Sequence, residues 1–102
     1  MQNIRKATKD DVSRIAEIEI FNYRLNFYPI FRNDKYYFED LQVLTELHKL
    51  LCNPKNLKNT YVYDDGVVKG FIRVDGKEVK KLFVEPVLQG QGIGAKLLEF
   101  TI

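Results

Sequence analysis

The sequence predicts an α/β protein in which a short strand and two helices precede three antiparallel strands and a final helix. Residues 12–22 and 41–51 repeat apolar side chains every three or four positions, which is the spacing of one helix face. Apolar stretches between residues 60 and 84 are separated by Asp-Gly turn signals, which predicts an antiparallel meander. A glycine-rich segment, residues 89–95, then leads into the last helix.

The first helix has a start signal and a stop signal. Thr8 and Asp11 follow a strand predicted over residues 3–6, and their spacing resembles a capping box with Asp in place of Glu or Gln. We expect the helix to end near Asn26, because Tyr28 precedes a proline and such residues avoid the helical region.

Proline, glycine and aspartate bound the later elements. The second helix is predicted over Glu39 to Cys52, and Asn53-Pro54 ends it. The strands of the meander are predicted over residues 60–63, 67–74 and 77–84. Gly70 falls inside the middle strand, which indicates a bulge or a close approach of another backbone.

Composition and charge argue against several classes of protein. A chain of 102 residues suits one domain, and a net charge of +2 without long Lys/Arg runs does not favour nucleic acid. No apolar run approaches the ~20 residues that span a membrane. Cys52 is the single cysteine, which excludes an internal disulfide. We therefore expect a cytoplasmic protein that binds neither nucleic acid nor a membrane.

The glycine-rich segment has the features of a phosphate site. Gly90, Gly92 and Gly94 leave successive backbone N–H groups uncovered by side chains, at the point where a strand turns into a helix. The first amides of a helix have no intrahelical partner, and the helix dipole places partial positive charge there. Such an arrangement binds phosphate, so we expect residues 89–95 to hold a phosphate or pyrophosphate.

Three glycine patterns compete for this segment. A P-loop requires Gly-Lys-Ser/Thr, which the chain lacks. The spacing of Gly90, Gly92 and Ala95 fits a relaxed dinucleotide pattern, which needs an acidic residue about 20 positions later. The chain ends at Ile102, before that position, and such fingerprints usually occupy the first strand–turn–helix of a domain. The dinucleotide interpretation is therefore the weaker one.

The third pattern is Gln/Arg-x-x-Gly-x-Gly/Ala, which the chain carries at residues 89–94 as Gln-Gly-Gln-Gly-Ile-Gly. With its flanks Leu-Phe-Val-Glu-Pro (82–86) and Ala-Lys-Leu-Leu-Glu-Phe (95–100), it resembles the coenzyme A loop of the GNAT superfamily of N-acetyltransferases. Residues 4–11 resemble the first strand and helix start of that family, and residues 67–74 resemble its third strand.

The resemblance implies a mixed, largely antiparallel sheet and acetyl-CoA as acetyl donor, with no metal. The acetyl group would pass directly to a primary amine of an acceptor molecule. The backbone of Leu82, Phe83 and Val84 would pair with the pantetheine arm much as a further strand would. The pyrophosphate would be held by Gln89, Gly90, Gln91, Gly92, Ile93, Gly94 and Ala95.

Two residues are candidates for the chemistry. The resemblance places the N–H of Val84 at the thioester carbonyl, where it would act as an oxyanion donor. Glu78 lies eleven positions before Gln89, where some family members carry a glutamate that takes the amine proton through water. The alternative for Glu78 is an exposed strand residue beside Lys77 and Lys80.

An aromatic segment is the candidate acceptor pocket. Eight of the thirteen Phe and Tyr residues fall within residues 21–38. The GNAT resemblance implies that this segment lines the amine site, with Phe27, Tyr28 and Phe31 as the wall. The alternative is that these rings pack as core beneath a long loop.

The chain departs from the family in its length. GNAT domains continue for roughly 40 to 60 residues after this helix, within the usual size of a domain. The absent part supplies a strand, a helix, a hairpin and a tyrosine that protonates the thiolate. We therefore expect residues 1–102 to be one truncated domain, completed by a second copy at the exposed edge of strand 77–84. The alternatives are a non-catalytic CoA-binding remnant and a module that acts only by association.

Overall fold

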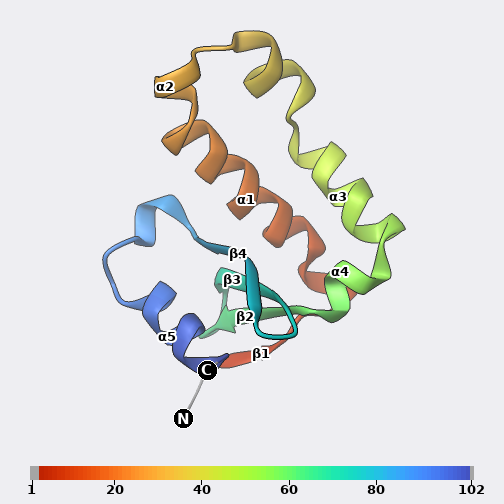
Figure 1. The fold of residues 1–102 in the computed structure, drawn as a ribbon, viewed down its shortest axis with the longest axis vertical. Helices are drawn as coiled ribbons and strands as arrows, with labels where there is room; N and C mark the ends of the chain where they lie inside the picture. Colours follow the sequence, from red (N-terminus) through yellow and green to blue (C-terminus); the bar gives the residue numbers. More distant parts are fainter. Residues whose placement is uncertain (1–2, 102) are drawn as a thin grey trace.

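The computed structural model describes residues 3–101, and its elements follow the predicted order (Figure 1). The strands are β1 (Ile4–Lys6), β2 (Thr60–Asp64), β3 (Val68–Asp75) and β4 (Glu78–Val84). The helices are α1 (Val12–Asn26), α2 (Tyr28–Phe31), α3 (Val43–Cys52), α4 (Pro54–Lys58) and α5 (Ile93–Phe100). A π-helical segment, Lys35–Asp40, and two 3-10 turns, Lys9–Asp11 and Pro86–Leu88, complete the set.

The four strands form one sheet in the order β1-β2-β3-β4, and each neighbouring pair is antiparallel. The register places Phe71 of β3 between Val62 of β2 and Phe83 of β4. The predicted meander is thus confirmed. Among the described residues, β4 pairs with β3 alone and forms one edge of the sheet.

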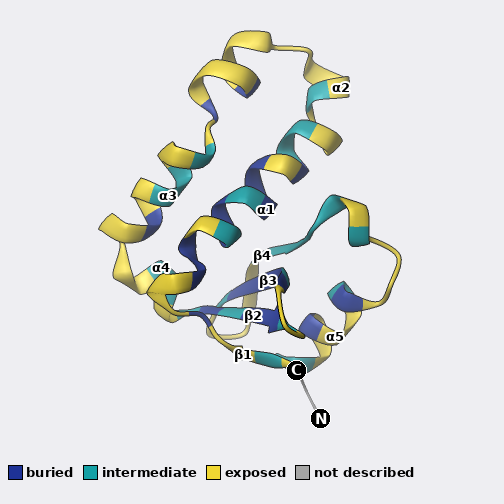
Figure 2. Ribbon diagram, turned by 180° about the vertical axis from the view of Figure 1, so that it is seen from behind, coloured by how far each residue is buried: buried dark blue, intermediate teal, exposed yellow. Residues whose placement is uncertain are grey.

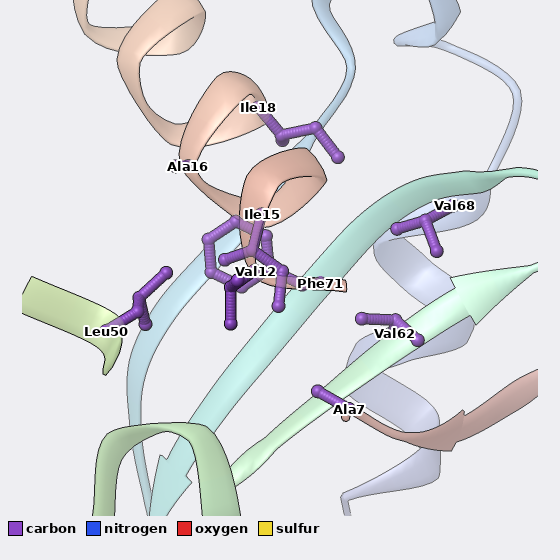
Figure 3. Packing of buried hydrophobic residues seen from close by; sticks show 9 residues of the cluster. All are labelled: Ala7, Val12, Ile15, Ala16, Ile18, Leu50, Val62, Val68 and Phe71. Carbon is purple, nitrogen blue, oxygen red and sulfur yellow. The ribbon is translucent and has the colours of Figure 1, made fainter. Parts of the chain in front are cut away.

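Helices cover both faces of the sheet. Helix α1, with α3 beside it, packs on one face, and α5 packs on the other face against β2, β3 and β4 (Figures 1 and 2). Figure 3 shows the larger core, in which α1 contributes Val12, Ile15 and Ile18 against Phe71 of the sheet. A second core joins Ile72 of the sheet to Ile93 and Leu97 of α5.

Gly70 lies where α5 and β4 approach β3 most closely. A Cβ atom at this position would stand 2.9 Å from the carbonyl oxygen of Phe83 and 3.3 Å from side-chain atoms of both Ile93 and Leu97. The close approach that the sequence suggested is therefore present. It sets how tightly α5, and with it the glycine loop, packs on the sheet.

The predicted start of the first helix is confirmed. Thr8 and Asp11 form a reciprocal capping box, in which the Thr8 N–H donates to Asp11 Oδ2 at 2.8 Å. Arg5 adds a bidentate contact to the same carboxylate at 2.8 and 2.9 Å. These hydrogen bonds, with Arg5 as the main contributor, lower the pKa of Asp11. Helix α1 ends at Asn26, as predicted.

The second helix differs from the prediction at its start and agrees with it at its end. It begins at Val43 instead of Glu39, because the chain forms the π-helical segment and then becomes extended at Leu41, with φ −93° and ψ 93°. Leu41 is buried with Ile20 and Tyr37, and this packing overrides the helical spacing of its neighbours. Asn53-Pro54 ends α3 as predicted, but Pro54 also starts the short helix α4, which sequence spacing did not indicate.

Candidate active site

The glycine loop presents open amides at the start of α5. Gly90 and Gly92 adopt left-handed φ values of +90° and +81°, which turn the chain from the Pro86–Leu88 turn into the helix. In the described part of the chain, no backbone or side-chain acceptor lies within hydrogen-bonding distance of the amides of residues 90–95. Helix α5 begins at Ile93, and Gly92 provides no side-chain cap. The predicted anion site therefore has free donors.

Successive residues of β4 direct their backbone N–H groups alternately toward β3 and toward the free edge of the sheet. Glu85 N–H donates to Lys69 O at 2.8 Å, so hydrogen-bonded pairs fall at residues 83 and 85, by the alternation of an antiparallel ladder. Leu82 and Val84 therefore direct their N–H groups away from β3, toward the free edge. Phe83 directs its backbone groups to β3 instead. Pairing of the Phe83 backbone with a pantetheine arm stays a prediction, and this orientation counts against it.

A buried amide joins this strand to the glycine loop. Asn22 is 2% exposed, and its Nδ2 donates to Val84 O at 2.8 Å. Its Oδ1 accepts from Gln89 Nε2 at 2.9 Å. Glu85 is held from the same helix, since Arg14 Nη1 lies 2.7 Å from its Oε2. Helix α1 thus anchors both the end of β4 and the first residue of the loop.

An aromatic pocket of about 400 Å³ lies between α1, α2, the π-helical segment and α3. It is lined by Tyr23, Phe27, Phe31, Tyr36, Tyr37, Leu41, Glu46 and Lys49. Two of the three predicted wall residues, Phe27 and Phe31, line it. Tyr28 lies beside it, where its hydroxyl donates to Asp34 Oδ1 at 2.5 Å.

The pocket reaches the edge strand through one ring. Tyr23 meets Phe83 edge-on, with ring centroids 5.5 Å apart. Phe83 directly precedes Val84, so the pocket wall ends one residue from the amide predicted to polarise the thioester. The side of the sheet that carries α1 therefore places an aromatic pocket next to the open edge of β4.

Glu78 lies far from this region. It is the first residue of β4, opposite Asp75 in the hairpin, and its side chain is 70% exposed and pairs with Lys80 at 3.0 Å. At about 3.3 Å per residue, the strand separates Glu78 from Val84 by about 20 Å. Its role as base stays a prediction, and this separation counts against it.

Buried charges lie under β3 and β4 instead. Glu19 of α1 is 2% exposed, and its Oε1 accepts from Lys81 Nζ at 2.8 Å. Its Oε2 has no hydrogen-bond partner among residues 3–101. Burial raises the pKa of Glu19, and the charge of Glu46 adds to this effect, whereas Lys81 opposes it. Burial likewise lowers the pKa of Arg73 on β3.

The glycine loop and the edge strand β4 both lie in the part of the chain that matches a known protein family. Residues 36–102, well over half of the chain, match the family model of the acetyltransferase (GNAT) domain. The chain belongs to the GNAT family. Comparison with curated protein sequences gives no significant match.

Solved structures described as acetyltransferases share the fold. PaiA N-acetyltransferase from Thermoplasma acidophilum, in complex with coenzyme A, is 20% identical with a TM-score of 0.65, over 95% of this chain and 67% of that one. YncA from Salmonella typhimurium, described as an acetyltransferase with its cofactor acetyl-CoA, is 24% identical with a TM-score of 0.58, over 96% and 59%. An N-acetyltransferase from Staphylococcus aureus Mu50 is 20% identical with a TM-score of 0.59, over 95% and 61%. This chain spans 59–67% of the length of these three structures.

The pyrophosphate site at residues 89–95 stays a prediction, and the sequence did not indicate which polar residues of α1 contact β4 and the loop. Glu19 and Asn22 occupy positions on the apolar face of that helix, at the same spacing as Ile15 and Ala16. A carboxylate and an amide on a core-facing stripe were the available signal, because buried polar groups need partners. Residues 3–101 contain neither a cluster of three metal-ligating side chains nor a helix suited to crossing a bilayer.

Proposed function

We propose that this chain is the N-terminal part of a single GNAT domain that transfers the acetyl group of acetyl-CoA to a primary amine. The observation that carries the proposal is the run of free amides at residues 90–95, beside the outward-facing backbone of Leu82 and Val84. A pyrophosphate suits the first and an extended amide-containing arm suits the second. The coenzyme A in PaiA and the acetyl-CoA in YncA support this choice of ligand.

The reaction proposed is direct attack. The amine nitrogen forms a bond to the thioester carbonyl carbon, the C–S bond breaks, and the coenzyme leaves as a thiolate that takes up a proton. The Val84 N–H would stabilise the negative charge that develops on the carbonyl oxygen. The attacking amine must first lose a proton, a role predicted for Glu78, although its separation from Val84 by about 20 Å counts against it.

The aromatic pocket is the proposed acceptor site. Phe27 and Phe31 supply apolar walls, and Glu46 supplies a carboxylate whose side chain is 14% exposed. Lys49, at 3.8 Å from Glu46, is 65% exposed and lies toward solvent. A mostly apolar cleft with one inward anionic group suits a molecule that carries an ammonium group.

The free edge of β4 supports a further proposal, that a strand from a second copy or from elsewhere in the protein covers it. Size-exclusion chromatography with light scattering tests the self-association. We expect a dimer at micromolar concentration. A monomer at every concentration would contradict pairing between copies.

The loop assignment can be tested by removing one amide. In the variant Gly94→Pro the second residue of α5 loses its N–H, and the first helical turn tolerates proline. The matched control is Gly94→Ala, whose Cβ would lie an ordinary 3.7 Å from Val84 Cγ2 and which keeps the N–H. We expect CoA affinity, measured by calorimetry, to fall roughly tenfold in the proline variant and to stay near wild type in the control.

Two outcomes would contradict the proposal. If pantetheine, which lacks the phosphates, binds as tightly as CoA, the loop does not hold the pyrophosphate. If CoA does not bind at all, acetyl-CoA is not the acetyl donor. A thiol-release assay with small-amine, polyamine and peptide acceptors then separates an enzyme from a protein that binds CoA without turnover.

A further inference from the structure

Asn22 makes four side-chain hydrogen bonds from a buried position. Besides its contacts with Val84 and Gln89, its Nδ2 donates to Ile18 O at 2.7 Å, and its Oδ1 accepts from Asn26 Nδ2 at 3.4 Å. Both partners of Nδ2 are carbonyl oxygens, which can only accept. The orientation of the amide is therefore fixed by its surroundings.

These contacts clamp one peptide group from both sides. The peptide between Val84 and Glu85 presents its oxygen to Asn22 at 2.8 Å and its N–H to Lys69 O at 2.8 Å. With both ends of this peptide held, the backbone on the C-terminal side of Val84 cannot rotate without breaking a hydrogen bond. The preceding peptide directs Phe83 O to β3, so the ladder and the clamp together keep the Val84 N–H pointing to the open edge.

The other side of Asn22 reaches the cofactor loop and the acceptor pocket. Gln89 is exposed and starts the glycine motif, and its Nε2 is tied to Asn22 Oδ1 at 2.9 Å. Tyr23, the next residue along α1, is the pocket residue that touches Phe83. One side chain therefore links the strand that carries the oxyanion donor, the loop that carries the amides and the helix that carries the pocket.

We propose that Asn22 is a positioning residue for acetyl transfer, which holds the peptide after Val84 so that the Val84 N–H faces the thioester. This inference rests on the proposed function for its catalytic part. The structural part, a clamp on the Val84–Glu85 peptide and on Gln89, stands without it. The contribution of Asn22 is orientation and not contact with substrate.

Asn22→Leu removes the clamp and keeps the number and branching of the side-chain heavy atoms, and Asn26→Leu is the matched control one turn along α1, where the side chain is exposed. Hydrogen exchange of the Glu85 amide, without cofactor, reads the clamp directly. We expect exchange at Glu85 to become about tenfold faster in Asn22→Leu, the size of one net hydrogen bond, and to be unchanged in Asn26→Leu. Amides in the middle of β2 serve as the internal reference.

Asn22→Asp gives a second test should the leucine variant fold poorly. An ionised carboxylate still accepts from Gln89 but cannot donate to Val84 O, whereas a protonated one can. We expect fast Glu85 exchange at neutral pH, corrected for the intrinsic pH dependence, and protection that returns as the pH falls. Unchanged Glu85 protection in both variants would overturn the clamp.

Kinetics test the catalytic part. In Asn22→Leu we expect kcat to fall about tenfold or more, while Gln89→Ala, which removes the loop contact alone, mainly raises the KM for acetyl-CoA. The loss of kcat should persist when both changes are combined. An unaltered kcat in a variant with fast Glu85 exchange would overturn the positioning role, whereas failure of wild type to turn over would contradict the proposed function and leave the exchange test in force.

Discussion

The two faces of the sheet bury different kinds of residue. On the α5 face, the buried cluster consists of Tyr63, Ile72, Ile93 and Leu97. On the face covered by α1 and α3, apolar residues are joined by the buried polar residues Glu19, Asn22, Thr60 and Arg73. Among residues 3–101, every buried charged or amide side chain lies on the α1 helix, at its start or on the strands beneath it.

This difference indicates what each face does. The α5 face only has to hold a helix close to the sheet, so that the amides before the helix stand beside β4, and close apolar packing achieves this. The α1 face borders a pocket and must direct side chains and one peptide group, which requires hydrogen bonds with defined geometry. Val84 is the last residue of the edge strand β4, and it lies close to the glycine loop as well as to the aromatic pocket.

The largest effect is expected from overfilling the α5 face. In Gly70→Ala the added methyl would lie 2.9 Å from Phe83 O, which is backbone and cannot move aside cheaply. We expect the free energy of unfolding to fall by about 2–3 kcal/mol, with weaker CoA binding as α5 shifts. Urea denaturation measures the first effect. Gly94→Ala is the control. Equal stability of the two variants would show that α5 and β4 do not pack as closely against Gly70 as described.

The next largest loss of stability is expected from replacing the Asp11 carboxylate, whose oxygens accept several hydrogen bonds at the start of α1. Asp11 is paired with Arg5 and Thr8, and Asp11→Asn should cost about 1–2 kcal/mol at neutral pH, because a charge-assisted pair and a cap are weakened. The lowered pKa means that this stability is present above the unfolded-state pKa of about 3.9 and is lost as the pH falls through the folded-state pKa.

Urea denaturation at several pH values checks this behaviour. Wild type should lose stability more steeply than Asp11→Asn below pH about 4, where the carboxylate becomes protonated. Asp10→Asn is a matched control, since Asp10 is an exposed neighbour. Parallel curves for wild type and Asp11→Asn would contradict the role of the Arg5 contact.

Substitutions in the aromatic pocket should change the KM for the acceptor amine and leave the KM for acetyl-CoA unchanged. Phe27→Ala removes part of the pocket wall and should raise the KM for an acceptor amine roughly three- to tenfold, with the KM for acetyl-CoA unchanged. Tyr28→Phe, one residue along, removes a hydroxyl that bonds Asp34 outside the pocket and should leave both constants unchanged. A larger effect from Tyr28→Phe would relocate the acceptor site.

The smallest effect, and the opposite pH dependence, is expected for Glu19. Its raised pKa means that its contribution is present below the unfolded-state pKa of about 4.3 and is lost as the pH rises through the folded-state pKa. Glu19→Gln should change stability by less than about 1 kcal/mol and flatten this decline, because a neutral amide avoids the cost of a buried charge. Denaturation at a series of pH values from about 4 upward measures this decline. A decline in Glu19→Gln as steep as that of wild type would show that Glu19 does not cause it.

Local sequence signals predicted the elements that have local causes. The capping box of Thr8, the end of α1 before Pro29, the strands of the meander and the helix after Gly92 all depend on residues a few positions apart. The break at Leu41 was missed because its cause is burial against Ile20 and Tyr37, which no spacing within residues 39–52 reveals. Tyr28, predicted beside Phe27 and Phe31 as a wall of the acceptor site, does not line the cavity that those two residues share.

By itself, the sequence determined the order of elements and the glycine loop, because turn residues and helix starts act through the backbone of their own neighbours. Tertiary structure alone decided which backbone groups of β4 are free, that Glu78 lies at the far end of that strand, and that Asn22 reaches Val84 across 62 residues. Those outcomes depend on strand register and on helix packing, and both are set by contacts between segments far apart in the chain.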